Sequence, residues 1–490
     1  MMRILPHRPA FAALALLPMA LVAGCQTVGP DFARPADPAP AAGYGSDGGD
    51  RASLAEGPEA RWWTTFQSNR LNALVDQALA GNHTLAASRA TLAKARERMA
   101  AVAGRQLPQV DASARAQYEK VNLAAFGFSG SLGGGQTFDN PEFDLYTVGA
   151  GVSYDLDLFG GNRRALEQAS AEAEAQARAS EAAHLLIAGR VVGQVLAIAA
   201  LNDRIETERR LLGEDERNVS LTQARMDAGA GTLVEVLSAQ GQLASDRASL
   251  PLLEQQLAEG RAMLAVLLGI SPAELGSTDF TLDDFVLPER VPVALPSALV
   301  HKRPDILEAE ARLHAATAAV GVATAQLYPD VTLGASITQS TSEPGRITSN
   351  RFNAFDLFAG VTVPIFHGGT LKANKRGAEA EARAAAAQYQ QTVTEAFGQV
   401  STLLTALESD GRELAARAEA AEVAGRSLHL SRRSFQVGNS GILQVLDASR
   451  SYQRARLSLL EARTRRYQNV ARLYVATAGG WITDPVSMQE

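Results

Sequence analysis

Four short stretches of the chain alternate between apolar and polar residues, and a long amphipathic segment follows each pair of them. The alternating stretches lie near residues 108–119, 143–157, 329–340 and 354–366. A period of two with one polar face is typical of a β-strand, whereas apolar residues that recur every three or four positions are typical of a helix. The pattern therefore predicts two β-hairpins, each followed by a helix of roughly 65–70 residues that would extend about 100 Å if unbroken.

The hairpin and its long helix occur twice in the chain. After each long helix the sequence turns at a glycine and runs back in a second helix. Gly229 and Leu237 of the first copy match Gly438 and Leu446 of the second at a constant offset of 209 residues, which indicates an internal duplication. Pro251 predicts a kink in the first returning helix. The predicted divisions are a first repeat over residues 61–276, a connector over 277–294, a second repeat over 295–482 and a C-terminal tail over 483–490.

The N-terminus has the pattern of a secretory signal. Residues 1–24 have a basic start, an apolar stretch and small residues before Cys25, the order typical of a signal peptide. Residues 22–25, Val-Ala-Gly-Cys, resemble the bacterial lipobox, which implies acylation of Cys25; the simpler interpretation is an ordinary signal peptide with an incidental cysteine. Two or three acyl chains anchor a protein stably, and by resemblance to sorting signals Gln26 favours the outer membrane. Residues 25–60, rich in Pro, Gly, Ala and Asp, are expected to form an extended tether.

The predicted strands have the length and alternation of membrane-spanning strands. Each is about ten residues long, enough for a tilted strand to cross a bilayer, and Tyr118, Tyr146 and Tyr154 near their ends suit an interfacial aromatic girdle. The same alternation also fits a soluble hairpin with one wet face. Four strands cannot close a barrel, because about eight is the smallest number in bacterial single-chain barrels, and open edges are forbidden in lipid. If the strands span a membrane, several chains must contribute them, and three chains would contribute twelve.

Composition and charge exclude several classes of function. The net charge is −7 and there is no basic run, so nothing indicates nucleic-acid binding. Cys25 is the only cysteine, which excludes an internal disulfide and a thiolate metal cluster. The sequence lacks the HExxH, GxSxG and P-loop motifs, and no GxGxxG opens a helix after a strand. His367 fits a turn better than a metal site. We therefore expect no enzymatic activity, no cofactor and no metal.

Several motifs, each modest alone, together resemble one family. In their order and on a duplicated frame, they make the chain similar to bacterial outer membrane factors, the TolC/OprM-like channels of tripartite efflux and secretion systems, and specifically to the lipoprotein NodT-like branch. The residues that carry the resemblance span nearly the whole mature chain. They are residues 28–32 (VGPDF) with Arg34 and Pro35, Trp62 with Trp63 and Phe66, residues 303–306 (RPDI) with 308–329, residues 366–369 (FHGG), and residues 446–448 (LDA) with Arg450.

The resemblance implies an α+β membrane protein that acts as a homotrimer. The trimer would form a twelve-stranded outer-membrane β-barrel continuous with a periplasmic α-helical barrel. It would provide an exit duct for small molecules, such as drugs and toxic compounds, from an inner-membrane pump through a periplasmic adaptor, the pump often being of the resistance-nodulation-division type. The chain would be lipid-anchored in the outer membrane and extend into the periplasm. The alternatives are an outlet for type I protein secretion and a lipid-anchored coiled-coil structural protein without a pore.

By motif matching, the resemblance assigns the periplasmic gate to the start of the second returning helix. Leu443 would form an apolar ring, Asp447 a charged ring, and Arg450 would be available for gating ion pairs. The spacing i, i+4, i+7 puts them on one helix face, and three Asp447 side chains around an axis would bind cations and reject anions. The alternative is an exposed Asp447–Arg450 pair worth a few tenths of a kcal/mol, with Leu443 in packing. The first repeat has Val234 and Ser238 at the positions of Leu443 and Asp447.

The turns between the paired helices are candidate docking sites for the adaptor. Gly229 and Gly231 mark the first turn, and Gly438 and Gly441 mark the second. The simpler interpretation is turn chemistry, since glycine adopts positive φ without steric cost. Both interpretations can hold together.

Overall fold

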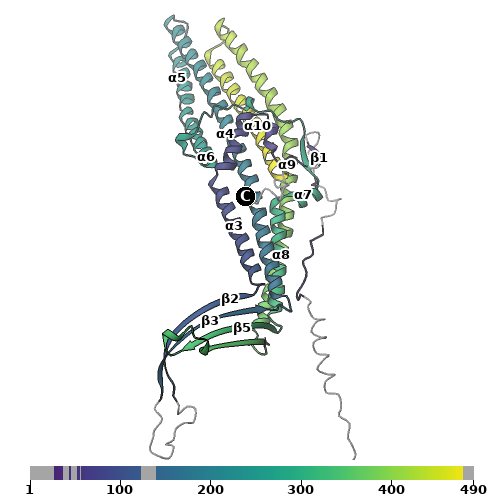
Figure 1. The fold of residues 1–490 in the computed structure, drawn as a ribbon. Helices are drawn as coiled ribbons and strands as arrows, with labels where there is room; N and C mark the ends of the chain where they lie inside the picture. The colour runs from purple at the N-terminus through teal and green to yellow at the C-terminus, as the bar shows by residue number, and fades with distance from the viewer. Residues whose placement is uncertain (1–26, 37–43, 46–51, 56, 123–139, 478–490) are drawn as a thin grey trace, which may run out of the picture. The chain divides into compact units, whose positions relative to one another are not determined.

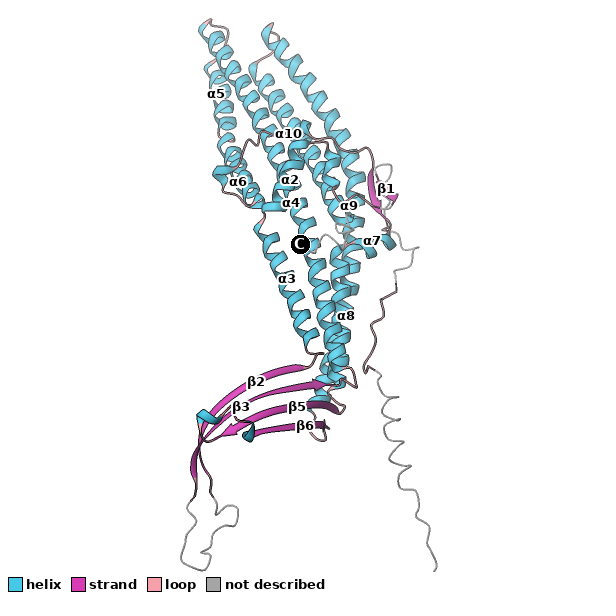
Figure 2. Cartoon of the chain, in the orientation of Figure 1, coloured by secondary structure: helices cyan, strands magenta, loops and turns pink. Residues whose placement is uncertain are grey.

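The structure is a computed structural model, and it describes residues 27–36, 44–45, 52–55, 57–122 and 140–477. Helices account for most of these residues, with one four-stranded and one two-stranded sheet (Figure 1, Figure 2). The chain divides into two compact units. The described part of the first comprises residues 27–33, 94–122, 140–173 and 311–386, and that of the second comprises 34–36, 44–45, 52–55, 57–93, 174–310 and 387–477.

The first unit contains an antiparallel sheet to which each repeat contributes one hairpin. Its strands are β2 (Gln109–Lys120), β3 (Glu142–Asp155), β5 (Asp330–Thr341) and β6 (Asn353–Thr362). They lie in the order β2-β3-β5-β6 (Figure 1), and the two hairpins join through β3 and β5, where Ser153 faces Gly334. Among the described residues, β2 and β6 each pair on one side only, so the sheet has two open edges. The two paired hairpins argue against the alternative of a coiled-coil structural protein without a pore.

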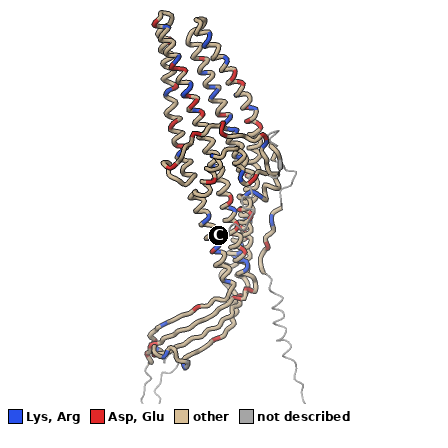
Figure 3. Tube along the Cα trace, turned by 45° about the horizontal axis from the view of Figure 1, so that its top comes forward, with Lys and Arg blue, Asp and Glu red and all other residues tan. Residues whose placement is uncertain are grey.

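One face of this sheet is apolar and uncovered. Phe355 and Leu357 of β6 are 82% and 76% exposed, and charged residues are sparser on the strands than on the helices (Figure 3). A contiguous exposed apolar face on a sheet is typical of a surface that contacts lipid. β6 ends at Thr362, short of the predicted limit at 366, because Pro364 has no N–H to give to the strand ladder.

Two helices of 67 residues form the long arms of the repeats, α4 (Gly161–Asp227) and α9 (Thr370–Gln436). Their ends correspond at the same offset of 209 residues found at the turns. α3 (His83–Gly104) and α8 (Pro304–Ala325) precede the two hairpins. In the described part of the chain, α4 alone has an 18-residue window long and apolar enough to cross a membrane, and half of that window is buried inside the chain, as in a core helix.

The returning helices differ between the repeats. The second repeat has one helix, α10 (Ile442–Thr477), whereas the first has two, α5 (Leu233–Arg247) and α6 (Leu250–Leu268). In place of the kink predicted at Pro251, the helix is interrupted at Ala248 and Ser249. Pro251 then lies in the first turn of α6, where its missing N–H costs no helical hydrogen bond.

The core of the second unit includes an aromatic cluster that joins the start of the first repeat to the end of the second. Trp62 and Phe66 belong to the 3₁₀ helix η2 (Trp62–Phe66) and contact Tyr474 of α10. Trp62 stacks on Tyr474 with ring centroids 5.4 Å apart, and all three side chains are fully buried. Truncation of such a ring to alanine costs about 3–5 kcal/mol. The short helices α2 (Asn69–Gly81) and α7 (Pro296–Lys302) belong to the same unit.

Part of the predicted tether is folded. β1 (Ala52–Ala55) pairs in parallel with β4 (Val291–Ala294) of the connector, and the Tyr44 hydroxyl donates a hydrogen bond to the Ala294 carbonyl oxygen at 2.7 Å. The expectation of an extended tether missed this pairing, because a strand of four residues shows no period and its partner is distant in sequence. The signal peptide, Cys25, Gln26 and the predicted tail lie outside the described residues.

Candidate functional site

The turn between α4 and α5 is closed by a glycine in the left-handed region. Gly229 has φ 73°. Its N–H donates to the Met226 carbonyl at 2.9 Å, and the Ala230 N–H donates to the Arg225 carbonyl at 2.8 Å. These two bonds satisfy the last carbonyls of α4 in the Schellman pattern. The turn between α9 and α10 has the same pair of bonds, from Gly438 (φ 80°) to Phe435 at 3.0 Å and from Asn439 to Ser434 at 2.9 Å.

The other two predicted glycines have a different role. Gly231 and Gly441 do not adopt positive φ, so only the first glycine of each turn requires the freedom of that residue type. After Gly231, Thr232 and Glu235 form a capping box at the start of α5. The second repeat has Gly441 at the position of Thr232, so α10 begins without this reciprocal pair.

The two turns meet within the second unit. The Arg225 guanidinium lies over the Phe435 ring, 4.6 Å from its centroid, and donates to the Phe435 carbonyl oxygen at 3.0 Å. A Cβ on Gly441 would lie 3.8 Å from a carboxylate oxygen of Glu235. The ends of the two helical hairpins therefore pack against each other in one chain.

Leu443 and Asp447 lie on the exposed side of α10, as their spacing predicts. The opposite side of the helix is a packed core, in which Ile442, Val445 and Leu446 are buried. Leu443 is 58% exposed, and Asp447 is exposed one turn further along. The helix therefore presents an uncovered apolar side chain and a carboxylate together.

Arg450 takes a partner that the sequence did not predict. Its Nε donates to the Oε1 atom of Gln242 on α5, and Gln242 Nε2 donates to Asp246 Oδ2 at 2.6 Å. Within the described residues Asp447 and Arg450 form no ion pair, so the alternative interpretation, an exposed i, i+3 pair, is not observed there. Sequence reasoning missed Gln242 and Asp246, and matching the two repeats would have marked both positions, because their counterparts are Ser451 and Ala455.

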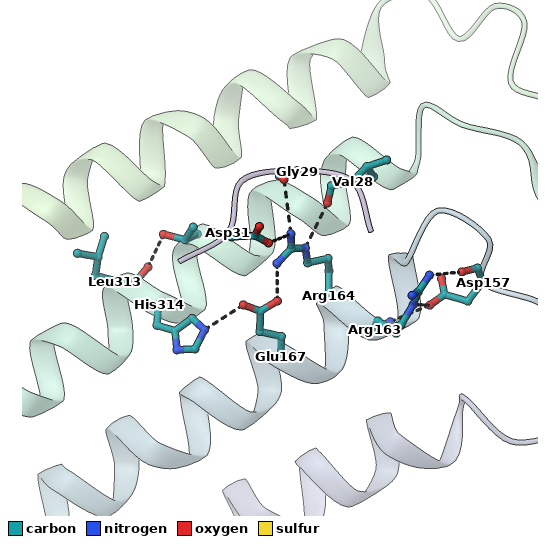
Figure 4. A network of polar contacts seen from close by, with 10 residues as sticks. Val28, Gly29, Asp31, Asp157, Arg163, Arg164, Glu167, Leu313 and His314 are labelled. Atoms are coloured by element: carbon teal, nitrogen blue, oxygen red, sulfur yellow. Dashed lines mark hydrogen bonds and ion pairs between the residues drawn. The ribbon is translucent and has the colours of Figure 1, made fainter. Parts of the chain in front are cut away.

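A second polar cluster, in the first unit, holds the segment that follows Cys25 (Figure 4). The Arg164 side chain is 5% exposed; its Nη2 donates to Asp31 Oδ1 at 2.6 Å and its Nη1 to Glu167 Oε2 at 2.7 Å. Arg164 Nε also donates to the Val28 carbonyl oxygen at 3.2 Å. Burial alone would raise the pKa of Glu167, but hydrogen bonds from Arg164 and His314 outweigh it and lower that pKa. Arg164 is therefore a buried cation that binds both backbone and side chain of the N-terminal segment.

The shape of this segment explains the VGPDF motif. Gly29 has φ 95°, and a Cβ there would lie 2.4 Å from the Gly321 Cα, so no other residue fits. The Phe32 ring stacks on His314 with centroids 4.3 Å apart, and the Val28 N–H donates to the Phe159 carbonyl at 3.1 Å. Residues 28–32 thus form a docked strap that begins three residues after Cys25.

The fold and the sequence match known channels over nearly the whole chain. The family described as outer membrane efflux protein matches residues 74–270 and 295–479. The pyoverdine export outer membrane protein OpmQ of Pseudomonas aeruginosa is 31% identical over 86% of this chain and 88% of its own length. Nodulation protein T of Rhizobium leguminosarum bv. viciae is 30% identical over 97% of this chain and 94% of its own length. The solved outer-membrane channel OprN superposes with a TM-score of 0.84 at 29% identity, covering 93% of this chain and 99% of OprN.

These matches confirm the predicted class and function. The protein is an α+β membrane protein of the outer membrane whose fold is that of trimeric efflux channels, and it is a channel and not an enzyme. It serves as the outer-membrane component of a tripartite efflux system, in which such channels work with an adaptor and an inner-membrane pump. By its motifs, its duplicated fold and its relatives, the chain belongs to the outer membrane efflux protein family.

Proposed function

We propose that Leu443 and Asp447 line the periplasmic entrance of the channel and restrict passage through it. The observation that carries the proposal is the exposed apolar and acidic face of α10 on a helix whose opposite face is a packed core. Exposed leucine is unfavourable in water, so a face of this kind is expected to contact equivalent side chains around the axis of a trimer. Three leucines would make an apolar constriction, and three carboxylates one turn away would favour cations over anions.

Arg450 belongs to the same proposed entrance, as a positioning residue. It lies one turn beyond Asp447 on α10 and is bonded to Gln242 of α5. This hydrogen bond connects the start of α10 to α5 of the first repeat. A substitution that removes it should therefore shift the position of the Leu443–Asp447 face. The first repeat carries Val234 and Ser238 at the positions of Leu443 and Asp447, so only one helix per chain would carry the acidic ring.

The entrance is tested by the conductance and ion selectivity of single channels in planar bilayers. Asp447→Ala should reduce the preference for cations, and Leu443→Ala should raise conductance by widening the constriction. Ser238→Ala, the matched position of the first repeat, should change neither. Unchanged conductance and selectivity in both entrance variants would contradict the proposal.

The two turns at Gly229–Gly231 and Gly438–Gly441 are proposed to dock the periplasmic adaptor. Gly229 and Gly438 have no neighbouring atom within 4 Å of an added Cβ, so this surface is open to a partner. Ala230→Trp in the first turn should lower the amount of adaptor that copurifies from membranes. Ala273→Trp, at an exposed site far along the chain from the turns, is the control. Equal recovery of adaptor with both variants would count against docking at the turn.

Acylation of Cys25 and a pump of the resistance-nodulation-division type complete the proposal. The docked strap at residues 28–32 supports the first, because it fixes the chain three residues beyond Cys25. Cys25→Ser should abolish labelling by a radiolabelled fatty acid, and retained label would refute acylation. The resemblance to the NodT-like branch supports the second, and mass spectrometry of copurified partners would identify the pump directly.

A further inference from the structure

A hollow of about 790 Å³ lies between helices of the two repeats in the second unit. It is lined by α4 and α6 of the first repeat and by α9 and α10 of the second, and its volume is within the range of about 300–1,000 Å³ that small-molecule sites have. Two glycines of α4, one helical turn apart, make room for it. A Cβ on Gly189 would lie 2.5 Å from the Val475 side chain, whereas a Cβ on Gly193 would meet no atom within 4 Å. The helices α4 and α10 therefore pack closely at Gly189, and the space opens at Gly193.

The lining of the hollow carries two cations and no carboxylate. Arg190 of α4 and Arg472 of α10 line it, and among the described residues no aspartate or glutamate does. Within the same described ranges, neither arginine has a hydrogen-bond or ion-pair partner. Each guanidinium thus keeps its N–H donors for a ligand, and its planar fork matches the two oxygens of a carboxylate. The charge of the hollow therefore favours an anion.

The uncharged polar lining adds more donors. Gln399 of α9 accepts a hydrogen bond from Arg303 at 2.7 Å through its amide oxygen, so its amide N–H groups remain for a ligand. Gln468 of α10 also lines the hollow and has both a donor and an acceptor. Gln194 of α4 donates to the Gly260 carbonyl oxygen at 3.0 Å and offers its own amide oxygen. Together with the two arginines, the hollow offers more donors than acceptors, as an anion requires.

The remaining lining is apolar and partly uncovered. Leu186 of α4 and Met263 of α6 are 46% and 54% exposed, and Leu267 and Val475 line the hollow beside them. Apolar surface of a ligand that covered these side chains would leave water together with theirs, which is favourable. The ligand that matches the whole lining is therefore one with an apolar body and an anionic group.

The two cations have uncharged counterparts in the same hollow. At the offset of 209 residues, Arg190 corresponds to Gln399 and Arg472 corresponds to Met263, and all four line the hollow. Each repeat thus contributes one arginine and one uncharged residue at equivalent places in the fold. These counterparts define the substitutions Arg190→Gln and Arg472→Met, which remove a charge and introduce a residue that the equivalent helix position already accepts.

We propose that this hollow binds an amphipathic anion, a molecule with an apolar body and a carboxylate or sulfonate group. The anionic group pairs with Arg190 and Arg472, and the apolar body covers the apolar side chains of α4 and α6. Such a molecule is either cargo carried in the duct or an amphiphile that reaches the hollow from outside the duct. The proposal does not rest on the proposed entrance, because Arg472 lies 25 residues beyond Asp447 on α10, about 37 Å along the helix axis.

Binding of 2-naphthoate to the full-length protein in lipid nanodiscs tests the proposal. This probe has a carboxylate on an apolar ring system, naphthalene-2-methanol is its neutral analogue, and empty nanodiscs measure partition into lipid. Equilibrium dialysis should show that the protein binds the carboxylate about tenfold more tightly than the alcohol. Arg190→Gln and Arg472→Met should each weaken binding of the carboxylate about tenfold and leave binding of the alcohol unchanged.

Two further variants separate the hollow from other surfaces. Arg261→Gln is the matched control, because Arg261 is an exposed cation of α6 outside the lining, and it should bind both molecules as the wild type does. Gly193→Leu fills the hollow and should abolish binding of both, with thermal unfolding as the check that this variant is folded. Equal affinity of the wild type for the carboxylate and the alcohol would overturn the proposal. Unchanged binding of the carboxylate in both Arg190→Gln and Arg472→Met would overturn it as well.

Single-channel conductance in planar bilayers distinguishes the two sources of the ligand. If the ligand is cargo, 2-naphthoate should lower the conductance of the wild type and not that of Arg190→Gln. Binding that the dialysis detects without a change in conductance supports the site and assigns its ligand to the outside of the duct. A block that persists in both arginine variants would place the anion elsewhere in the duct and contradict cargo binding in this hollow. Failure of the entrance proposal is detected separately, by Asp447→Ala in the absence of 2-naphthoate.

Discussion

The two repeats have the same backbone at their helical turns and different polar side chains around it. Gly229 and Gly438 close α4 and α9 with the same two hydrogen bonds, and both long helices have 67 residues. Residues that determine shape are therefore duplicated. Some charged residues are not: Arg164, which holds the N-terminal strap in the first repeat, corresponds to Ala373 in the second, and the exposed Asp447 of the second corresponds to Ser238.

This difference shows where function should be sought in a duplicated protein. The apolar period and the glycine turn are sufficient to build a helical hairpin, so both copies had to keep them. A polar residue present in only one copy is not needed for that shape. Such residues are the ones that hold the N-terminal strap, connect α5 to α10 and form the proposed acidic ring.

The largest effect that tests the comparison is expected at Arg164. Arg164→Ala removes the arginine partner of Glu167 and the contacts that hold the strap. Loss of one member of a buried ion pair costs about 3 kcal/mol. The free energy of unfolding, measured by urea titration of the solubilised protein, should fall by about that amount, and protease should cut within residues 27–36.

Arg163→Ala provides the matched control. Arg163 adjoins Arg164 but is 45% exposed and pairs with Asp157 at 3.3 Å, so its loss should cost less than about 1 kcal/mol. Equal losses for the two variants would mean that the strap is not held specifically by the buried cation.

The turn glycines should show effects of similar size in both repeats. Gly229→Ala and Gly438→Ala place a Cβ on a residue in the left-handed region, at a cost of about 1–2 kcal/mol each. Gly241→Ala inside α5, where an added Cβ meets no atom within 4 Å, should instead stabilise by about 0.5–1 kcal/mol. Thermal unfolding of the three variants measures this change of sign, and a loss at Gly241 equal to that at Gly229 would contradict the assignment of the turns.

The capping box should show a smaller effect, and only in the first repeat. Thr232→Ala removes the bond from the Glu235 N–H to the threonine side chain, which should cost about 1 kcal/mol. Gln444→Ala, at the second-repeat position that matches Glu235, breaks no capping box and should change stability by no more than a few tenths of a kcal/mol. Hydrogen exchange in the first turns of α5 and α10 would measure the two losses separately, and equal losses would show that the capping box contributes nothing.

The sequence predicted features that depend on a local period and missed those that depend on packing between elements. The duplication, the four strands and the long helices follow from alternation and from matched glycines. The parallel pairing of β1 with β4 and the Arg450–Gln242 bond bring together residues that are far apart in sequence, and no period marks such contacts. At the site, spacing predicted the shared face of Leu443 and Asp447, but the turn of Arg450 toward α5 depends on how α5 packs against α10.

The central claim is that residues unmatched between the repeats control passage, and Asp447 is its most direct test. Reversal potentials of single channels in a salt gradient measure the preference for cations. They are compared for the wild type, for Asp447→Ala and for the double variant that carries Asp447→Ala and Ser238→Asp. We expect Asp447→Ala to lose most of the cation preference. We expect the added Ser238→Asp, on the matched face of the first repeat, to restore little of it. An unchanged reversal potential in Asp447→Ala, or full restoration by Ser238→Asp, would contradict the claim.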